Sequence, residues 1–265
     1  MKIYMVGATK AGAGKLGKLN EDAFYCDPDI AVALVADGVT RPTGADGLYP
    51  RDEGVIAPGL FSRVVPEVLR DARPCSLSCA ENDMRRAFCV ANEVIRQQNE
   101  LRTEPNFLTS DYLSTTGVVW WLPRIGSQAV VGFLGDCLAF HLPFGMSPVL
   151  LTRNQLCDWN RYYQIALFDG EDVLEDADVE VNLKRRYLQR TKIRNMRNCV
   201  GVGGVDIQGY GDLTGEITAL DFVEIRLVAV SPGDLFVLLS DAARSYVSSD
   251  GSTPDVVWDY FNLFR

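Results

Sequence analysis

Acidic residues stand at the ends of several apolar runs, and their types and spacing could do chemistry. An apolar strand that ends in an acid holds the carboxylate at the edge of a sheet, where several such ends can converge in one cleft. Clustered carboxylates repel one another, so they persist near neutral pH when cations bind between them. The residues concerned are Asp37 after IAVALVA, Asp136 after AVVGFLG, Asp241 after DLFVLLS, and Glu21 and Asp22 before AFYC.

The metal that such a site would hold is constrained by the rest of the composition. The chain has one histidine, His141, which excludes metal sites that need two or more imidazoles. Oxygen ligands favour hard ions such as Mg²⁺ or Mn²⁺. Gly38 would let the backbone carbonyl turn toward an ion without a Cβ in the way. The alternative is that each strand-end Asp only marks a turn, since Asp favours turns whatever its function.

Composition limits the partners and the compartment. The 265 residues are 47% hydrophobic and 23% charged, which is ordinary for a globular domain, and the net charge of −9 argues against nucleic acid and anionic membrane as primary partners. No apolar stretch reaches the roughly 18 residues of a membrane-spanning helix. The seven cysteines include no C-x-x-C pair and mostly sit in apolar runs, as buried free thiols do. We therefore expect a reducing cytoplasm.

The elements that must position these acids follow from periodicity. Strand patterns dominate both ends of the chain and helical patterns lie between early and middle strands, which predicts an α+β sandwich of two antiparallel sheets with helices outside. One domain spans 1–265, with the polar segment 170–217 as an insertion or flap lobe. Predicted strands are 2–6, 30–36, 115–122, 128–134, 137–142, 147–151, 221–230 and 234–239, and predicted helices are 55–70, 80–100 and 155–168.

Two of these elements carry more specific predictions. In 80–100, the residues Met84, Phe88, Ala91 and Ile95 share one face, as in an amphipathic helix. In 55–70, Pro66 predicts a break or kink.

The strand-end acids belong to short sequence motifs that follow one another along the chain. Asn20-Glu21-Asp22 is followed by a strand ending in Asp37-Gly38, then by 114–119 (STTGVV), 134–140 (LGDCLAF) and 233–242 (GDLFVLLSDA). This order resembles the PP2C family of metal-dependent protein phosphatases over residues 18 to 245. The resemblance implies a PP2C-like sandwich that removes phosphate from phosphoserine and phosphothreonine in a protein substrate.

The resemblance also implies roles for individual residues. Asp37 would bridge two Mn²⁺ or Mg²⁺ ions, Gly38 would offer its carbonyl to one ion, and Asp241 would bind the other. Glu21 and Asp22 would bind directly or through water, and Asp136 would contribute to an accessory third-metal site. A water held between two cations becomes a hydroxide-like nucleophile that attacks phosphorus in line.

The sequence departs from the family pattern at several positions, and two of these departures bear most on the site. Gly17 stands where the family carries a phosphate-binding arginine, so Lys18 and Arg41 are the candidate phosphate-binding cations. The family's last metal-binding motif, D-N before a β-branched strand, is not found after Asp241. The alternative function is therefore a catalytically impaired PP2C-like module that binds a phosphoprotein or regulatory partner. The oligomeric state is left open.

Other patterns have simpler interpretations. Residues 6–16 resemble a phosphate-binding loop, but Thr9 stands where the pattern needs its first glycine and Leu16 where it needs Ser or Thr, which favours a turn. Residues 201–204 (GVGG) are predicted as a loop, and the basic run 184–197 as a solvated helix face. His141 is predicted to be packed in a strand, and Trp120 and Trp121 to be sheet residues with one ring buried.

Overall fold

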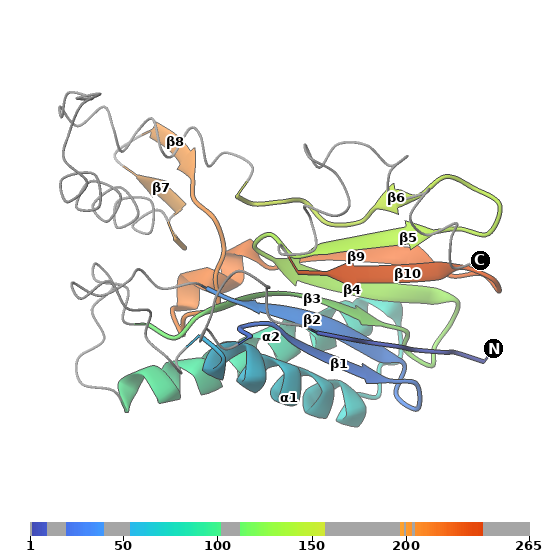
Figure 1. Ribbon diagram of the computed structural model, residues 1–265, viewed down its shortest axis with the longest axis horizontal. Helices are drawn as coiled ribbons and strands as arrows, with labels where there is room; N and C mark the ends of the chain where they lie inside the picture. Colours follow the sequence, from blue (N-terminus) through green and yellow to red (C-terminus); the bar gives the residue numbers. More distant parts are fainter. Residues whose placement is uncertain are drawn as a thin grey trace.

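Most of the strands form two antiparallel sheets in the computed structural model, which describes residues 2–9, 20–39, 54–101, 112–156, 197–198, 200–202 and 205–240. The larger sheet has the order β1 (Ala23–Asp27), β2 (Val32–Gly38), β3 (Thr115–Trp121), β4 (Gln128–Leu134) and β9 (Glu224–Ala229). The smaller sheet has the order β10 (Leu235–Leu239), β5 (Leu138–Leu142) and β6 (Val149–Leu150), and β7 (Val200–Val202) pairs with β8 (Val205–Gln208). This confirms the predicted sandwich (Figure 1).

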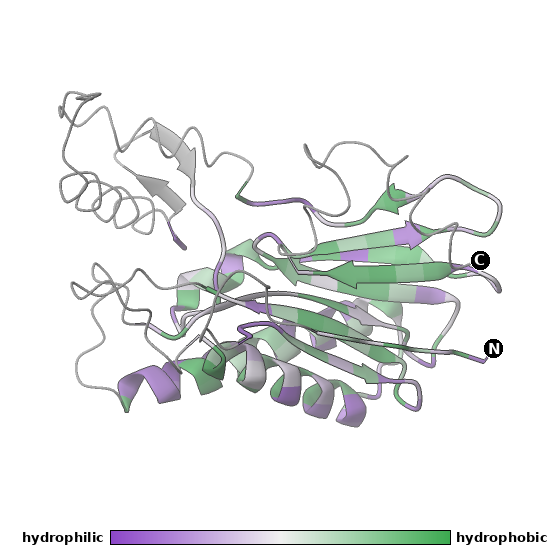
Figure 2. Cartoon of the chain, viewed as in Figure 1, coloured by the Kyte–Doolittle hydropathy of each residue, from purple (hydrophilic) through white to green (hydrophobic). Residues whose placement is uncertain are grey.

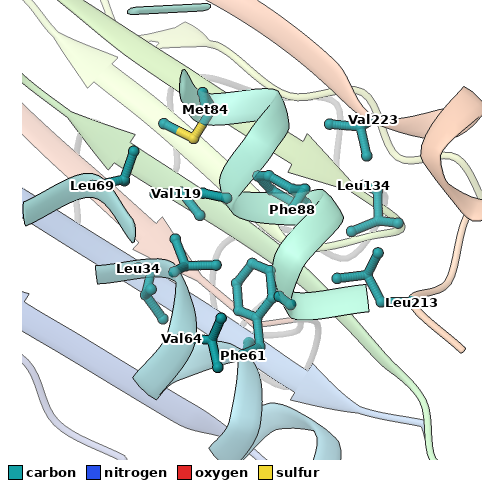
Figure 3. Close-up of a cluster of buried hydrophobic side chains, with 14 of the residues drawn as sticks. Leu34, Phe61, Val64, Leu69, Met84, Phe88, Val119, Leu134, Leu213 and Val223 are labelled. Atoms are coloured by element: carbon teal, nitrogen blue, oxygen red, sulfur yellow. The ribbon is translucent and has the colours of Figure 1, made fainter. Parts of the chain in front are cut away.

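Two helices cover the outer face of the larger sheet. α1 (Ile56–Asp71) and α2 (Leu77–Glu100) pack against each other and against β2, β3 and β4 (Figure 1). The predicted apolar face of α2 is fully buried, because Met84, Phe88, Ala91 and Ile95 enter the core beneath the sheet. Phe88 meets Phe61 of α1 edge to face at 5.3 Å between ring centroids, and Figure 3 shows both rings among the surrounding aliphatic side chains.

A second apolar layer lies between the two sheets. Val118, Trp120 and Phe133 of the larger sheet pack there with Cys137 and with Phe236 of β10. The strands of both sheets are mostly hydrophobic, while hydrophilic residues gather along the helices (Figure 2). The sandwich therefore has one core between the sheets and another under the helices.

The two tryptophans correct a prediction. Trp120 and Trp121 are both buried, with exposures of 5% and 3%. Successive strand residues point to opposite faces, so Trp120 enters the layer between the sheets and Trp121 the layer under the helices. Both faces of β3 are covered, which the local sequence does not reveal.

Several element boundaries differ from the predictions. Residues 2–6 form no strand, and β6 is much shorter than 147–151. The run 221–230 begins with the end of a 3₁₀ helix, η1 (Ile217–Phe222), before β9 starts. Of the predicted loop 201–204, Gly201 and Val202 belong to β7, and 203–204 lie outside the described residues. Of the predicted helix 155–168, only 155–156 lie in the described part of the chain, where they form a turn.

Pro66 does not break α1. The helix runs from Ile56 to Asp71, and Pro66 is one of its buried residues. A proline inside a helix removes one backbone hydrogen bond and costs about 3 kcal/mol in an isolated helix. Burial of the apolar face of α1 against the sheet and α2 offsets that cost. In the described ranges, neither helix is both long and apolar enough to cross a membrane.

Candidate metal centre

The register of β1 and β2 places two of the predicted acids side by side. Ala23 pairs with Ala36, and Gly38 donates its backbone N–H to the Glu21 carbonyl at 3.1 Å. Asp22 therefore lies opposite Asp37. Residues of one β2 face alternate, so the Asp37 side chain shares the face of Val35, which looks toward the smaller sheet.

Glu21 points away from this pair. Its carboxylate packs against Gly54, two residues before α1, where a Cβ added to Gly54 would lie 2.4 Å from Glu21 Oε1. Gly38 is packed just as closely, because an added Cβ would lie 2.1 Å from the Gly54 carbonyl oxygen. The structure therefore gives Gly38 a packing reason in addition to its predicted carbonyl role. Of the two neighbouring acids, Asp22 is the one that faces Asp37.

Strand β3 brings Asp136 to the same end of the sandwich. Thr116 pairs with Asp37 across the sheet, and its hydroxyl donates to Asp136 Oδ1 at 3.2 Å. The neighbouring Thr115 hydroxyl donates to the Asp37 carbonyl oxygen at 2.8 Å. These two threonines belong to the 114–119 motif, but the sequence analysis predicted no role for them. They link Asp37 and Asp136 through a single pair of residues.

Strand β10 brings the smaller sheet to this end as well. The Ser240 hydroxyl donates to Asp22 Oδ2 at 3.1 Å, across 218 residues of sequence. Asp241 is the next residue along the chain and lies outside the described residues, as do Lys18 and Arg41. The ends of both sheets therefore meet at Asp22.

The donor set fits hard cations, although the described residues supply only part of it. Asp22, Asp37 and Asp136 are reached from one end of the sandwich, and their oxygens suit Mg²⁺ or Mn²⁺. Within the described ranges, however, no three acid, histidine or cysteine side chains lie close enough together to hold a metal ion. The assignment of the metal ligands stays a prediction.

Gln155 supports the turn that carries Asp136, a role that sequence reasoning missed. Its Oε1 accepts from the backbone N–H groups of Gly135 at 3.0 Å and Gly211 at 3.1 Å, and its Nε2 donates to the Phe222 carbonyl at 2.8 Å. Gly135 has φ of +84°, which favours glycine. A glutamine in a polar stretch gives no signal of such a contact in the sequence.

A buried ion pair lies beside the start of β3. Arg197 and Asp212 are paired at 3.4 Å with side chains 2% and 0% exposed, and Arg197 also donates to the Ser114 hydroxyl at 3.1 Å. Arg197 had been predicted to lie on a solvated helix face. The prediction is wrong for this residue because long-range pairing with residue 212 buries it; the rest of the basic run lies outside the described residues.

Two buried asparagines complete this support. The Asn99 side chain at the end of α2 donates to the carbonyls of Leu113 and Thr214 at 3.0 and 2.8 Å. Asn198 donates to the Asp212 carbonyl at 2.9 Å and accepts from the Asp212 N–H at 2.9 Å. The candidate site end of the sandwich is thus fixed by side chains that satisfy backbone groups between segments.

Comparison with solved structures gives a consistent set of matches. The serine/threonine phosphatase PstP of Mycobacterium tuberculosis is 17% identical, with a TM-score of 0.53 over 97% of this chain and 86% of that one. The PstP catalytic domain in complex with two manganese ions is 18% identical, with a TM-score of 0.52 over the same shares. Stp1 from Staphylococcus aureus is 15% identical, with a TM-score of 0.53 over 97% and 86%.

The chain has the PP2C fold. Its two antiparallel sheets and few helices match those of the phosphatases, and the predicted fold class is confirmed. No protein-family model and no curated protein matches the sequence itself. At these identities the PP2C likeness establishes the fold, and activity has to be argued from the site.

Proposed function

We propose that this protein is a metal-dependent phosphoserine and phosphothreonine protein phosphatase. The observation that supports this most is the Ser240–Asp22 hydrogen bond, because it joins the ends of both sheets where the predicted ligands stand. The PP2C fold and the oxygen-rich end of the sandwich support the same reaction class. The substrate class is a phosphorylated protein, and we propose a cytoplasmic location.

The residues of the chain would do the following. Asp37 would bridge two ions, with Gly38 O on one and Asp241 on the other, while Asp136 would serve a third ion. When bound, the ions would acidify a water and neutralise phosphate charge. Thr115 holds the backbone of Asp37 through its carbonyl, and Thr116 orients the carboxylate of Asp136.

Hydrolysis of p-nitrophenyl phosphate and of a phosphothreonine peptide, with and without Mn²⁺, tests the proposal. We expect turnover that needs Mn²⁺ or Mg²⁺ and disappears with EDTA. A matched control is Asp27→Asn, at the far end of β1, which should keep the activity. Turnover that is equal with and without metal would contradict a metal-dependent reaction.

The second candidate is a PP2C-like module that binds a phosphoprotein without turnover. It is favoured by the departures from the family pattern: Gly17 stands where the family carries a phosphate-binding arginine, and residues 242–265 hold no D-N motif before a β-branched strand. The same assay separates the candidates: the module would bind a phosphopeptide in a calorimetric titration but release no phosphate under any metal condition. Equal affinity for the phosphorylated and the unphosphorylated peptide, without release of phosphate, would contradict both candidates.

We propose that Lys18 and Arg41 bind the phosphate, because Gly17 stands where the PP2C family carries a phosphate-binding arginine. Both residues flank, in the sequence, the motifs that contain Asp22 and Asp37. A phosphate dianion needs cationic donors to fix its orientation. We expect Lys18→Ala or Arg41→Ala to raise KM for a phosphopeptide about tenfold, which corresponds to about 1.4 kcal/mol. An unchanged KM in both single variants and in the double variant would mean that other groups hold the phosphate.

A further inference from the structure

Two cysteines meet at the start of α2, far from the candidate metal centre. The sulfur atoms of Cys75 and Cys79 are 3.0 Å apart, and Cys75 is exposed while Cys79 is partly exposed. A disulfide needs the sulfurs at about 2.05 Å, so a shift of about 1 Å would bring them to bonding distance. This corrects the expectation that most of the cysteines are buried thiols. The pair is both close together and accessible.

The local backbone explains why the sulfurs meet. Ser76 caps α2 in an extended conformation, and its hydroxyl accepts from the Cys79 backbone N–H at 3.2 Å. The chain therefore turns sharply into the helix, which brings the residue before the cap beside the third residue of the first turn. The first turn of α2 contains no acidic residue, so its free N–H groups favour a thiolate there.

The two thiols have different acidities. Hydrogen bonds from the Cys75 thiol, and then from Ser76, lower the pKa of Cys79 to about 7. The hydrogen bond to Cys79 raises the pKa of Cys75. By contrast, burial raises the pKa of Cys26, which lies in β1 of the larger sheet. Of the two thiols, Cys79 therefore loses its proton first as pH rises.

We propose that Cys75 and Cys79 form a redox-active dithiol that exchanges with low-molecular-weight disulfides. The Cys79 thiolate attacks one sulfur of the disulfide, and the first thiolate leaves as a mixed disulfide forms. Cys75 then loses its proton and attacks the Cys79 sulfur, and the second thiolate leaves. The two protein sulfurs lose two electrons in total and the small disulfide gains them, so the products are one internal disulfide and two small thiols.

The dithiol lies at the opposite end of α2 from the candidate metal centre. α2 has 24 residues, and its last turn reaches the start of β3 through Asn99 and Leu113. At 1.5 Å per residue the two ends are roughly 36 Å apart. The exchange reaction is therefore independent of the proposed phosphatase activity, and failure of either does not affect the other.

Mass spectrometry of the reduced protein after incubation with glutathione disulfide tests the proposal. Trypsin should release residues 71–85 as one peptide, because Arg73 precedes a proline, and this peptide holds Cys75 and Cys79 without another cysteine. We expect it to become about 2 Da lighter and resistant to alkylation. Cys89, an exposed thiol on the same helix, falls in peptide 87–96 and is the internal control.

Two variants assign the order of attack. In Cys75→Ser, the glutathione mixed disulfide should remain trapped on Cys79. In Cys79→Ser, Cys75 should react about tenfold more slowly than Cys79 does in the unchanged protein, as expected for a thiol with a smaller thiolate fraction. The proposal is overturned if peptide 71–85 is oxidised no faster than Cys89, or if it carries two glutathiones instead of an internal disulfide.

Discussion

Strands β1 and β10 have polar groups at both ends, and the two ends use them differently. At the far end of β1, Asp27 accepts from the Tyr25 hydroxyl at 2.8 Å and pairs with Arg70 at 3.4 Å. At the other end, Asp22 precedes the strand and accepts from the neutral hydroxyl of Ser240. One acid pairs with a cation, whereas the other faces Asp37 across the sheet.

Strand β10 repeats the contrast. Asp234 before its first residue bonds His141 at 2.9 Å and accepts from the N–H groups of Ser231 and Phe144. His141 is packed in β5 as predicted, stacked on Phe236 with centroids 4.5 Å apart. At the other end of β10, Ser240 reaches Asp22. At the ends away from the candidate metal centre, the polar groups of both strands thus take part in contacts that stabilise the fold.

The acidities at the far end agree with this. The Tyr25 hydroxyl is the largest cause that lowers the pKa of Asp27. Burial raises the pKa of Asp234, but hydrogen bonds from Ser231, Phe144 and His141 together lower it more. At the far end, the carboxylates accept several hydrogen bonds, which stabilises the fold. At the other end, two carboxylates face each other, so a cation bound between them would relieve their repulsion. The partners of a strand-end acid decide which of these it does.

The largest expected effect comes from removing charge at the converging end. Asp37→Asn should reduce metal-dependent turnover by about a thousandfold, because the proposed bridging ligand is lost. The fold should survive, since one charge leaves a group of like charges. Steady-state kinetics and circular dichroism measure both effects. Asp27→Asn, the counterpart at the far end, should leave turnover unchanged, and equal losses in both variants would end the functional contrast between the ends.

The next effect concerns the support of the converging end. Arg197→Met should lower the free energy of unfolding by about 3–5 kcal/mol, because it leaves Asp212 buried without this cation. Urea unfolding measures the loss. Adding Asp212→Leu should restore much of it, since the uncompensated charge is then removed. A single variant as stable as the unchanged protein would show that the buried pair does not hold the segments together.

A smaller effect is expected from the far-end acid of β10. Asp234→Asn should lower the free energy of unfolding at pH 7 by about 1–2 kcal/mol, as a charged acceptor with several donors is lost. Since the folded pKa of Asp234 is lowered, this stability is present above the unfolded pKa of about 3.9 and is lost as pH falls through the folded pKa. Thermal unfolding between pH 7 and about pH 2 should show the stability difference between the two proteins narrowing only below the unfolded pKa of about 3.9.

The gap would contradict this assignment if it widened as pH fell, because Asp234 would then contribute more when protonated. Turnover should be unaffected at pH 7, since Asp234 lies at the end of β10 away from Ser240. A loss of turnover without a loss of stability would move Asp234 from the structural to the functional group of acids.

The smallest effect is expected at Arg70, whose side chain is 47% exposed. Arg70→Ala should change the free energy of unfolding by less than about 0.5 kcal/mol, because solvent and salt screen exposed ion pairs. Arg70→Lys serves as the matched control that keeps the charge. Denaturant melts at low and high salt would detect a larger contribution, which would place the Asp27 pair among the groups that stabilise the fold strongly.

Much of the local structure was predictable because periodicity records it. The run 128–134 is β4 to the residue, and the apolar face of α2 is buried as its spacing indicates. The strand-end acids were also visible, since an apolar run followed by an acid is a local pattern. These features depend on residues a few positions apart, so the sequence alone carries them.

The pairing of distant segments was decided only by the tertiary structure. Ser240 meets Asp22 and Arg197 meets Ser114 because the order of strands in the two sheets brings them together. The local sequence around each partner holds no trace of the other, so Arg197 looked like a solvated charge. The same is true of the acids at the two ends of β1. Asp22 and Asp27 are the same residue type. Only the segments packed beside them make Asp27 the partner of Arg70 and Asp22 a candidate metal ligand.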